Sequence, residues 1–361
     1  MEIVRFVIRR LRAQRALAVG IVVTLAFAIA AISSAPIFID GARAAIYQST
    51  FANASEPVRD IRISLFAKPT DWAESDRQIR AAISDVPTDA VVDQGLASAR
   101  LLNYTGQLIL MFRDGADEHL TFTDGRPPRD GEVVIPSGLA FATGLGVGDA
   151  LPVLGPSGAT IPLKITGIFE PPPRTDPFFF GEDSPFSIEQ GRAPGSSGPP
   201  PPVVTTRSTA LNMARRLDLS TSFSWDLYLP WDRMTWEQAE VLEPVQHTID
   251  ERLLDTLTTA RAHVAGGIPE LIGNVRRSVE DLQTPVFLVA LQILLVGLAV
   301  IAGVGVLLAA RQGFELAILH SRGFSRGWLF RVQLLQAGAA AVVALPIGLL
   351  FARALAAFAG L

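Results

Sequence analysis

The segment between residues 311 and 331 carries the side chains best suited to binding another macromolecule. It is short and basic, and it joins two long apolar stretches. At helical spacing, Glu315, Leu319 and Arg322 lie along one face, because side chains three and four positions apart are neighbours on a helix. Gly323 then permits a tight turn. Two polar contacts around an apolar one suit docking onto a partner protein. The alternative is a short loop whose basic residues serve only to set membrane topology.

Side-chain sets for catalysis or metal binding are missing from the sequence. There is no cysteine, no His-x-x-x-His pair and no Gly-x-Ser-x-Gly elbow. The four histidines are scattered, at His119, His247, His263 and His320. The Gly-x-x-x-x-Gly-Lys-Ser/Thr pattern of a phosphate-binding loop is also absent. The sequence therefore predicts a protein that is not an enzyme, with no catalytic residues, no cofactor and no metal.

Three apolar stretches are long enough to cross a membrane. The hydrocarbon core of a bilayer is ~30 Å thick and takes ~20 helical residues to span. The stretches are residues 16–32, which can extend through 39, then 286–309 and 332–352, and none contains Asp, Glu, Lys or Arg. We expect three transmembrane helices.

Basic residues predict the orientation of these spans. Five arginines precede the first span and four lie between the second and third, and each group contains a single acidic residue. Basic residues in short loops beside spans stay cytoplasmic. Residues 36–309 instead carry 21 basic and 33 acidic residues, a formal charge of −12. The sequence thus predicts a multi-pass protein of the cell (plasma) membrane with a cytoplasmic N-terminus and a large extracytoplasmic region.

The N-terminus has two alternative interpretations. A cleavable signal peptide would use residues 33–35 as its small-residue site. The basic region is long for a signal peptide and the apolar run is at the upper end of a signal core, which favours an uncleaved span. The basic residues could also bind nucleic acid, but their position beside a span makes anionic lipid headgroups the simpler partner. We expect membrane lipid, and no nucleic acid, as the partner here.

The extracytoplasmic region shows mixed helical and strand patterns. Without cysteine, it must be held together by its own core rather than by disulfides. The first helix is expected to project beyond the membrane and to end near residues 53–55. Alternation and capping signals then predict strands at 58–66, 101–112, 119–123 and 224–229, and a helix at 71–83 with Thr70 or Asp71 as N-cap.

Residues 124–170 are the most patterned part of this region. They predict a turn, a buried strand at 132–135, a helix at 137–143, a Gly-rich turn and two further strands. We expect Gly146 and Gly148 to adopt backbone angles that other residues reach only with strain.

Two longer segments complete the region. Residues 171–202 are proline-rich and predict a loop insertion of extended chain. Its three phenylalanines, residues 178–180, could form an exposed patch, but packing beneath the loop is the favoured interpretation. Apolar residues then recur every four positions from 241 to 257 and resume at 271 after Gly266-Gly-Ile-Pro. This pattern predicts a helical stalk over 235–283, about 70 Å long at ~1.5 Å per residue, running into the second span.

Three pieces of the chain resemble the FtsX-like permease family, the MacB-type membrane subunits of ABC transporters. They are the basic helix 9–15 before the first span, segment 124–170 with Gly131-Glu-Val-Val-Ile-Pro and Ile165-Thr-Gly-Ile-Phe-Glu, and segment 311–331. In that last segment the matching positions are Glu315, Leu319, Arg322, Gly323, Ser325 and Arg326. The resemblance implies a mixed α/β (α+β) extracytoplasmic core domain and a coupling segment, made by these six residues, that docks on a separate ABC ATPase subunit.

The resemblance also implies the organisation of the protein. We expect a basic N-terminus and first span at 1–39, a core domain and stalk at 40–284, and the remaining spans at 285–361 around a coupling segment at 310–331. The family half-unit has four spans and this chain has three, so a partial chain is expected. A second permease half or a homodimer, and an extracytoplasmic partner or cargo, are the further partners implied.

The sequence is compatible with three classes of function. The favoured one is a permease subunit that couples ATP hydrolysis by a partner to motion of the extracytoplasmic domain, for efflux, lipoprotein or lipid handling, or cell-envelope regulation. A membrane-anchored extracytoplasmic sensor or receptor is the alternative, although no cytoplasmic output domain occurs within these 361 residues. An ectoenzyme is disfavoured by the missing catalytic set.

Overall fold

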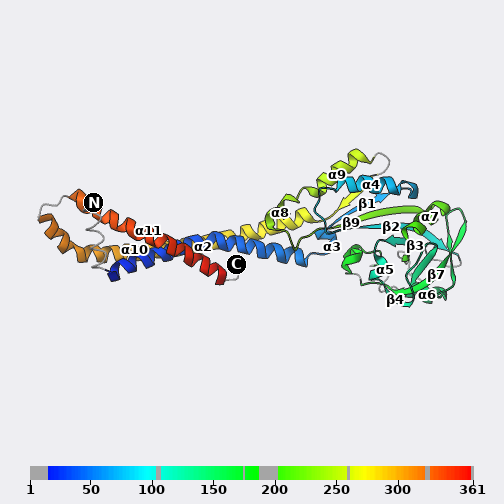
Figure 1. Cartoon of the computed structure of the whole chain (residues 1–361), viewed down its shortest axis with the longest axis horizontal. Coiled ribbons are helices and arrows are strands. Elements are labelled where there is room, and N and C mark those ends of the chain that lie inside the picture. The colour runs from blue at the N-terminus through cyan, green and yellow to red at the C-terminus, as the bar shows by residue number, and fades with distance from the viewer. Residues whose placement is uncertain are drawn as a thin grey trace. The chain divides into compact units, whose positions relative to one another are not determined.

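The computed structural model describes residues 15–102, 107–173, 175–186, 202–257, 261–321 and 326–358. The chain divides into two compact units. We call Met1–Tyr47 with Val275–Leu361 the helical unit, and Gln48–Asn274 the α/β unit. Figure 1 shows the long helices of the first and the strands and short helices of the second.

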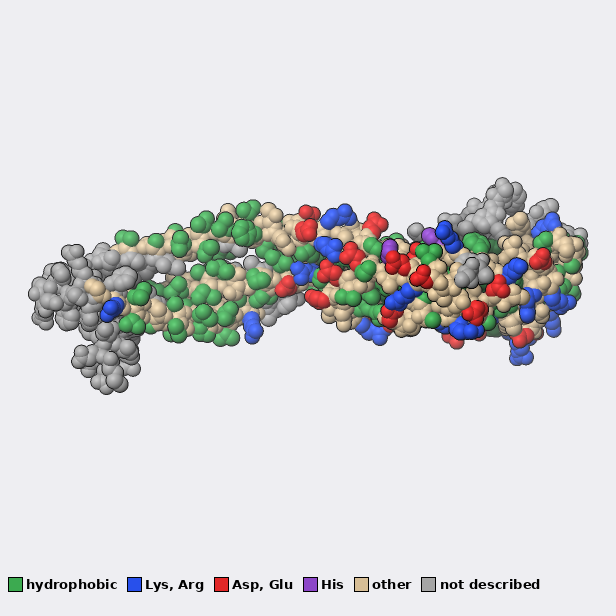
Figure 2. Space-filling view, turned by 90° about the horizontal axis from the view of Figure 1, so that it is seen from above, with side chains coloured by type: hydrophobic (Ala, Val, Ile, Leu, Met, Phe, Trp, Pro, Cys, Tyr) green, Lys and Arg blue, Asp and Glu red, His purple; other side chains and the backbone are tan. Residues whose placement is uncertain are grey.

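The helical unit contains the parts of three long helices that fall within it. These helices are α2 (Arg15–Asn53), α10 (Ile268–Ser321) and α11 (Arg326–Phe358). By length and composition, Val19–Asn53 and Ile268–Ala299 are long and apolar enough to cross a membrane, whereas the apolar stretch Gly338–Ala354 is shorter. Within the described residues, two of the three predicted spans therefore pass this test. In Figure 2, most of the side chains that are coloured on these helices are apolar, while charged side chains are frequent on the α/β unit.

Small residues allow the helices of this unit to pack closely. A Cβ added at Gly348 of α11 would lie 2.7 Å from the carbonyl oxygen of Ala26 in α2. One added at Gly297 of α10 would lie 3.5 Å from the Cβ of Ala28. Close approach at small residues is how helices associate in lipid, where burial of apolar surface offers little driving force.

The α/β unit is built on one ten-stranded mixed sheet in its described residues. Its order is β10-β1-β9-β2-β3-β8-β5-β7-β4, and β6 pairs with both β2 and β7. The strands are β1 (Ile61–Phe66), β2 (Ala90–Leu101), β3 (Gln107–Arg113), β4 (Thr121–Gly125), β5 (Glu132–Pro136), β6 (Ala150–Leu154), β7 (Thr160–Glu170), β8 (Pro202–Thr205), β9 (Ser220–Tyr228) and β10 (Ala262–Ala265). Because β6 bridges β2 and β7, the strands β2, β3, β8, β5, β7 and β6 form a closed ring of pairings.

Short helices connect and cover these strands. They are α3 (Glu56–Arg59), α4 (Trp72–Ala82), α5 (Ala116–His119), α6 (Ser137–Thr143), α7 (Arg207–Leu217), α8 (Trp236–Val241) and α9 (Val245–Thr256), with 3-10 turns η1 (Pro69–Asp71), η2 (Pro177–Phe179) and η3 (Gly181–Asp183). The α4 helix packs its buried Trp72 on the sheet, where the Trp72 ring stacks on Trp225 at 5.1 Å and meets Phe112 edge-on at 5.3 Å. Aromatic clusters of this kind fix the helix on the sheet beyond the area they bury.

The predicted elements of residues 124–170 are confirmed. Strand β5, helix α6 and strands β6 and β7 follow in the expected order, and α6 has the predicted bounds. Gly148 has the positive φ expected of it, at 100°. Gly146 does not, and its neighbour Gly144 instead ends α6 with φ 70°. The prediction for Gly146 was therefore wrong. The left-handed glycine is two positions earlier, because α6 ends with such a residue as its C-terminal cap.

The predicted helical stalk over 235–283 is wrong before residue 268. Helices α8 and α9 are separate and short, and β10 then pairs antiparallel with β1 at the edge of the sheet. Helical spacing alone did not reveal the strand, since Ala262–Ala265 is only four residues long. From Ile268, α10 runs as one helix into the predicted second span.

Three other predictions have clear outcomes. The helix over 71–83 is confirmed as α4, although the Asp71 side chain makes no capping hydrogen bond. The predicted strand 101–112 is two elements, with Leu101 ending β2 and Gln107 beginning β3. The phenylalanines of the proline-rich loop pack as expected, with Phe179 and Phe180 fully buried.

Candidate functional site

Three of the six predicted docking residues lie near the ends of two helices. Glu315 and Leu319 are four residues apart in α10, which ends at Ser321, and Arg326 begins α11. Arg322, Gly323 and Ser325 lie outside the described residues. The helical spacing expected for Glu315 and Leu319 therefore occurs, and the docking role of the six residues stays a prediction.

A buried ionic network crosses four strands of the α/β unit. Arg62 of β1 lies opposite Asp226 of β9, and Gln94 of β2 lies opposite Arg113 of β3. Alternate residues along a strand share a face, so these side chains meet on one side of the sheet. Arg62 binds Asp226 through two hydrogen bonds of 2.6 and 2.8 Å. Arg113 NH1 donates to Asp226 Oδ2 at 2.6 Å and to Gln94 Oε1 at 3.1 Å.

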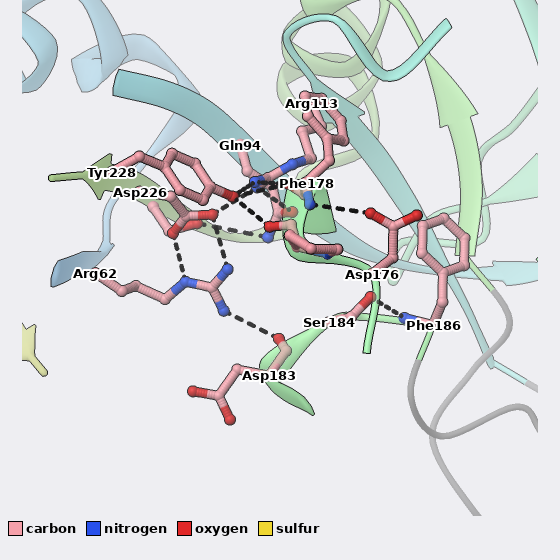
Figure 3. Close-up of polar contacts among 12 residues, drawn as sticks. Arg62, Gln94, Arg113, Asp176, Phe178, Asp183, Ser184, Phe186, Asp226 and Tyr228 are labelled. Carbon is pink, nitrogen blue, oxygen red and sulfur yellow. Dashed lines mark hydrogen bonds and ion pairs between the residues drawn. The ribbon is translucent and has the colours of Figure 1, made fainter. Parts of the chain in front are cut away.

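The network forms hydrogen bonds with the segment 176–186, which we call the phenylalanine strap. Arg62 NH1 donates to the Asp183 carbonyl at 3.0 Å, and Arg113 NH2 donates to the Phe178 carbonyl. The Tyr228 hydroxyl also donates to the Phe178 carbonyl, at 2.9 Å. Figure 3 shows these groups converging on the strap from β1, β3 and β9. Carbonyls that would otherwise be buried without donors are thereby satisfied.

Aromatic contacts reinforce the strap. The Arg62 guanidinium lies 4.2 Å from the centre of the Phe180 ring, and that of Arg113 lies 4.9 Å from the Phe178 ring. Phe180 has φ 64°, a left-handed backbone that costs on the order of 1 kcal/mol or more for a bulky residue. The strap keeps this conformation because its side chains and carbonyls are fixed by the sheet below.

A second ionic cluster lies on the opposite face of the sheet, centred on Asp93 of β2. Arg80 of α4 contacts Asp93 at 2.6 Å and Arg207 of α7 contacts it at 3.0 Å. Burial raises the pKa of Asp93 to about 6, and the two guanidinium groups oppose the shift. Trp225 Nε1 donates to the neighbouring Asp76 at 2.9 Å. These contacts tie α4 and α7 to the middle of the sheet.

A third polar group surrounds Asp60, which caps the end of α3 and is only 2% exposed. Its carboxylate accepts from the Leu229 backbone N–H at 2.9 Å and from Arg59 Nε at 3.4 Å. Burial raises the pKa of Asp60 to about 6, against the lowering effect of these donors. Asp60 lies at a cavity of about 450 Å³.

None of these clusters has the arrangement of a catalytic centre. Within the described residues, no group of three His, Cys, Asp or Glu could hold a metal ion. His119 stacks on Phe178 with ring centres 3.6 Å apart, and His247 lies 3.5 Å from Glu251. His263 is in strand β10, and His320 is in helix α10. The clusters position backbone and side chains, and they offer no nucleophile paired with a base.

Sequence reasoning missed all three clusters. Arg62, Arg113 and Asp226 were each within or beside a predicted strand, but their partners are 113 to 164 positions away. The available signal was a charged residue within or beside a predicted strand. Such a residue must find a partner, because a buried charge is stable only when paired.

Comparison with known proteins gives matches among solved structures alone. No family model matches the chain, and no curated protein matches it. The periplasmic region of MacB from Actinobacillus actinomycetemcomitans is similar with a TM-score of 0.32 and 13% identity, over 61% of this chain and 92% of that one. The extracellular domain of the noncanonic ABC-type transporter YknZ from Gram-positive bacteria is similar with a TM-score of 0.31 and 12% identity, over 56% and 99%.

Proposed function

We propose that the chain is a membrane (permease) subunit of an ABC-type transporter or mechanotransmission complex. ATP hydrolysis by a separate ABC ATPase subunit would move the extracytoplasmic α/β unit. The observation that carries the proposal is the order of elements along the chain. The α/β unit, Gln48–Asn274, is flanked in sequence by the two stretches that are long and apolar enough to cross a membrane. A short basic segment follows the second of them.

The continuity of α10 supports a mechanical role. This helix of 54 residues begins at Ile268 beside β10 and includes Glu315 and Leu319 near its other end. Pro285 lies inside the helix and removes one backbone hydrogen bond, but no loop interrupts α10 between Ile268 and Ser321. Force applied at one end therefore has a continuous helical path to the other. Docking of an ATPase at Glu315, Leu319, Arg322, Gly323, Ser325 and Arg326 would therefore act on the element that leads into the α/β unit.

The topology proposed for this function follows the positive-inside rule. The N-terminus and the segment 310–331 are cytoplasmic, and the α/β unit is extracytoplasmic. A second permease half or a second copy of this chain completes the membrane part, surrounded by lipid. The motion serves efflux, lipoprotein or lipid handling, or regulation of the cell envelope through an extracytoplasmic partner or cargo.

Crosslinking tests the proposal directly, because the chain has no cysteine. A photocrosslinker attached to Leu319→Cys in native membranes is expected to capture a P-loop ATPase. Phe141→Cys is the matched control, since Phe141 is 93% exposed on the α/β unit and is expected to capture no ATPase. Capture of a kinase or adaptor at position 319, or of nothing by a correctly inserted chain, would favour the sensor alternative.

A further inference from the structure

A cavity of about 450 Å³ lies where β9 ends, wholly within the α/β unit. Phe51, Asp60 and Trp231 line it and are almost completely buried, so they form its floor. Asp89 and Asp232 also line it, and their side chains are 40% and 80% exposed, so they form its rim. A volume of this size lies within the ~300–1,000 Å³ typical of sites for small organic ligands.

The floor of the cavity is aromatic. The Phe51 and Trp231 rings lie with centres 4.4 Å apart and planes tilted by 35°. Tyr228 adds a third aromatic side chain to the lining. Aromatic faces carry partial negative charge and attract cations, and Trp does so most strongly. The apolar area of the same rings also suits the hydrocarbon body of a ligand.

The charged lining points to the same kind of ligand. Three carboxyl groups, those of Asp60, Asp89 and Asp232, line the cavity with a single guanidinium, that of Arg59. Arg59 is already engaged by Glu56 at 3.1 Å and by Asp60 at 3.4 Å. Arg233 pairs with Asp89 and lies 3.9 Å from Asp232. With Glu56 included, four carboxylates still face two guanidinium groups, so the surroundings of the cavity favour a cation over an anion or a neutral ligand.

We propose that this cavity binds a small organic cation, an amine or quaternary ammonium with an apolar body. Phe51 and Trp231 contact the body, and the carboxylates of Asp60, Asp89 and Asp232 balance the charge. The inference goes beyond the proposed function and does not depend on it, because every residue that carries it belongs to the α/β unit. It requires no ATPase and no particular topology.

A proton competes with the ligand at Asp60. Burial raises the pKa of this carboxyl to about 6, and a bound cation favours the ionised form. Binding should therefore weaken as the pH falls through about 6. The ionisable groups around Asp60 are Glu56 and Arg59 of α3, Asp89 before β2, Tyr228 of β9, and Asp232 and Arg233 after it.

Ligand-detected saturation-transfer NMR on the full chain in phosphatidylcholine nanodiscs tests the proposal, with empty nanodiscs as blank. The probes are benzyltrimethylammonium, benzyl alcohol and benzoate, which share an aromatic body and differ in charge. We expect saturable binding of the cation, weaker binding of the alcohol and none of benzoate. Equal binding of benzyl alcohol, preference for benzoate, or no saturable binding would overturn the proposal.

Variants locate the binding. Asp60→Asn and Trp231→Leu are each expected to weaken cation binding by roughly tenfold, as loss of one desolvated contact to a cation implies. Asp60→Asn should also remove the pH dependence near 6. Asp124→Asn, an exposed position of β4 outside the cavity, is the control and should bind as the parent does. If Asp60→Asn does not fold, Trp231→Leu and the rim variant Asp232→Asn test the site instead. Unchanged cation binding in both variants would refute it.

Discussion

Asp226 is the residue on which the phenylalanine strap depends most. Its carboxylate is fully buried and balances two arginines, one of which, Arg113, is also fully buried. Removing the charge from Asp226 leaves Arg113 and Arg62 without an anion in a site closed to water. We therefore expect Asp226→Asn to lower the free energy of unfolding by about 3 kcal/mol or more. Urea titration followed by tryptophan fluorescence measures this, because Trp72, Trp225, Trp231 and Trp236 all belong to the α/β unit.

The control for Asp226 is Asp124→Asn, which makes the same chemical change at an exposed position of β4. It should alter stability by less than about 0.5 kcal/mol. Limited proteolysis separates a local effect from a global one, since cleavage within 176–186 should increase first in Asp226→Asn. Equal stability of the two variants would mean that the buried network contributes little to the fold.

Asp60 and Asp93 predict an unusual dependence of stability on pH. Burial raises the pKa of each to about 6, above the ordinary value of 3.8. The folded state therefore binds these protons more tightly than the unfolded state, and the free energy of unfolding falls as the pH rises through about 4 to 6. Between pH 5 and 7.5 each carboxyl should lower it by about 1 kcal/mol. Urea titrations of the full chain at the two pH values and constant salt provide the measurement.

Asp60→Asn isolates one of these contributions. Asparagine keeps a carbonyl oxygen to accept the Leu229 N–H and does not titrate. The difference in stability between pH 5 and pH 7.5 should shrink by about the 1 kcal/mol assigned to Asp60. A variant as pH-dependent as the parent, or a parent protein that gains stability as the pH rises, would contradict the assignment.

At the scale of elements, the two glycines between β10 and α10 allow the backbone to pass close to α3. A Cβ added at Gly266 would lie 2.8 Å from the Asp60 carbonyl oxygen, a backbone atom that cannot move alone. Gly266→Ala is therefore expected to cost about 1–3 kcal/mol through overpacking. Gly273, inside α10, has nothing within 4 Å of its added Cβ, so Gly273→Ala should instead stabilise by up to about 1 kcal/mol. Thermal unfolding of the pair gives the sign of each effect, and a shift of the same sign in both would show that the close approach does not matter.

Elements defined by their own turn residues were predictable from the sequence, and elements defined by distant neighbours were not. Helix α6 follows β5 without a gap and ends at Gly144, so local signals suffice. Strand β2 was missed because it lacks a clear alternation of apolar and polar residues. Gly95 in its middle makes room for Phe112 of β3, whose ring carbon Cε1 would lie 2.1 Å from an added Cβ. This requirement for glycine comes from packing against a neighbouring strand, so it produces no pattern in a short stretch of sequence.

The functional residues also divide into those that the sequence could predict and those that it could not. The docking residues Glu315 and Leu319 could be proposed because they lie one helical turn apart in a single segment. The cavity at Asp60 could not, because its walls come from the end of α2, from α3 and from the chain that follows β9. Only the sheet register brings Tyr228 and the residues after it back beside the start of the unit.

For the whole molecule, the proposed topology predicts which positions are reached from outside the cell membrane. Phe141→Cys is expected to react with a membrane-impermeant maleimide in intact spheroplasts, because Phe141 is 93% exposed on the α/β unit. Gln312→Cys, in the basic segment, should react only after the membrane is permeabilised. Labelling at Gln312 in intact spheroplasts, or protection at Phe141 until permeabilisation, would reverse the orientation.

If the proposed function is correct, a change in the proposed docking segment should uncouple ATP hydrolysis by the partner from transport. Leu319 is the proposed apolar contact between two polar ones, and Leu319→Asp would place a charge in the ATPase groove. Because residue 319 belongs to the helical unit and not to the α/β unit, the urea midpoint of the tryptophan signal should stay at its parental value. Transport by the assembled complex should fall to near background while the ATPase partner still hydrolyses ATP. The conservative variant Leu319→Met should retain transport, since a flexible apolar side chain fills the same space. Normal transport by Leu319→Asp would show that this helix is not where force enters the chain.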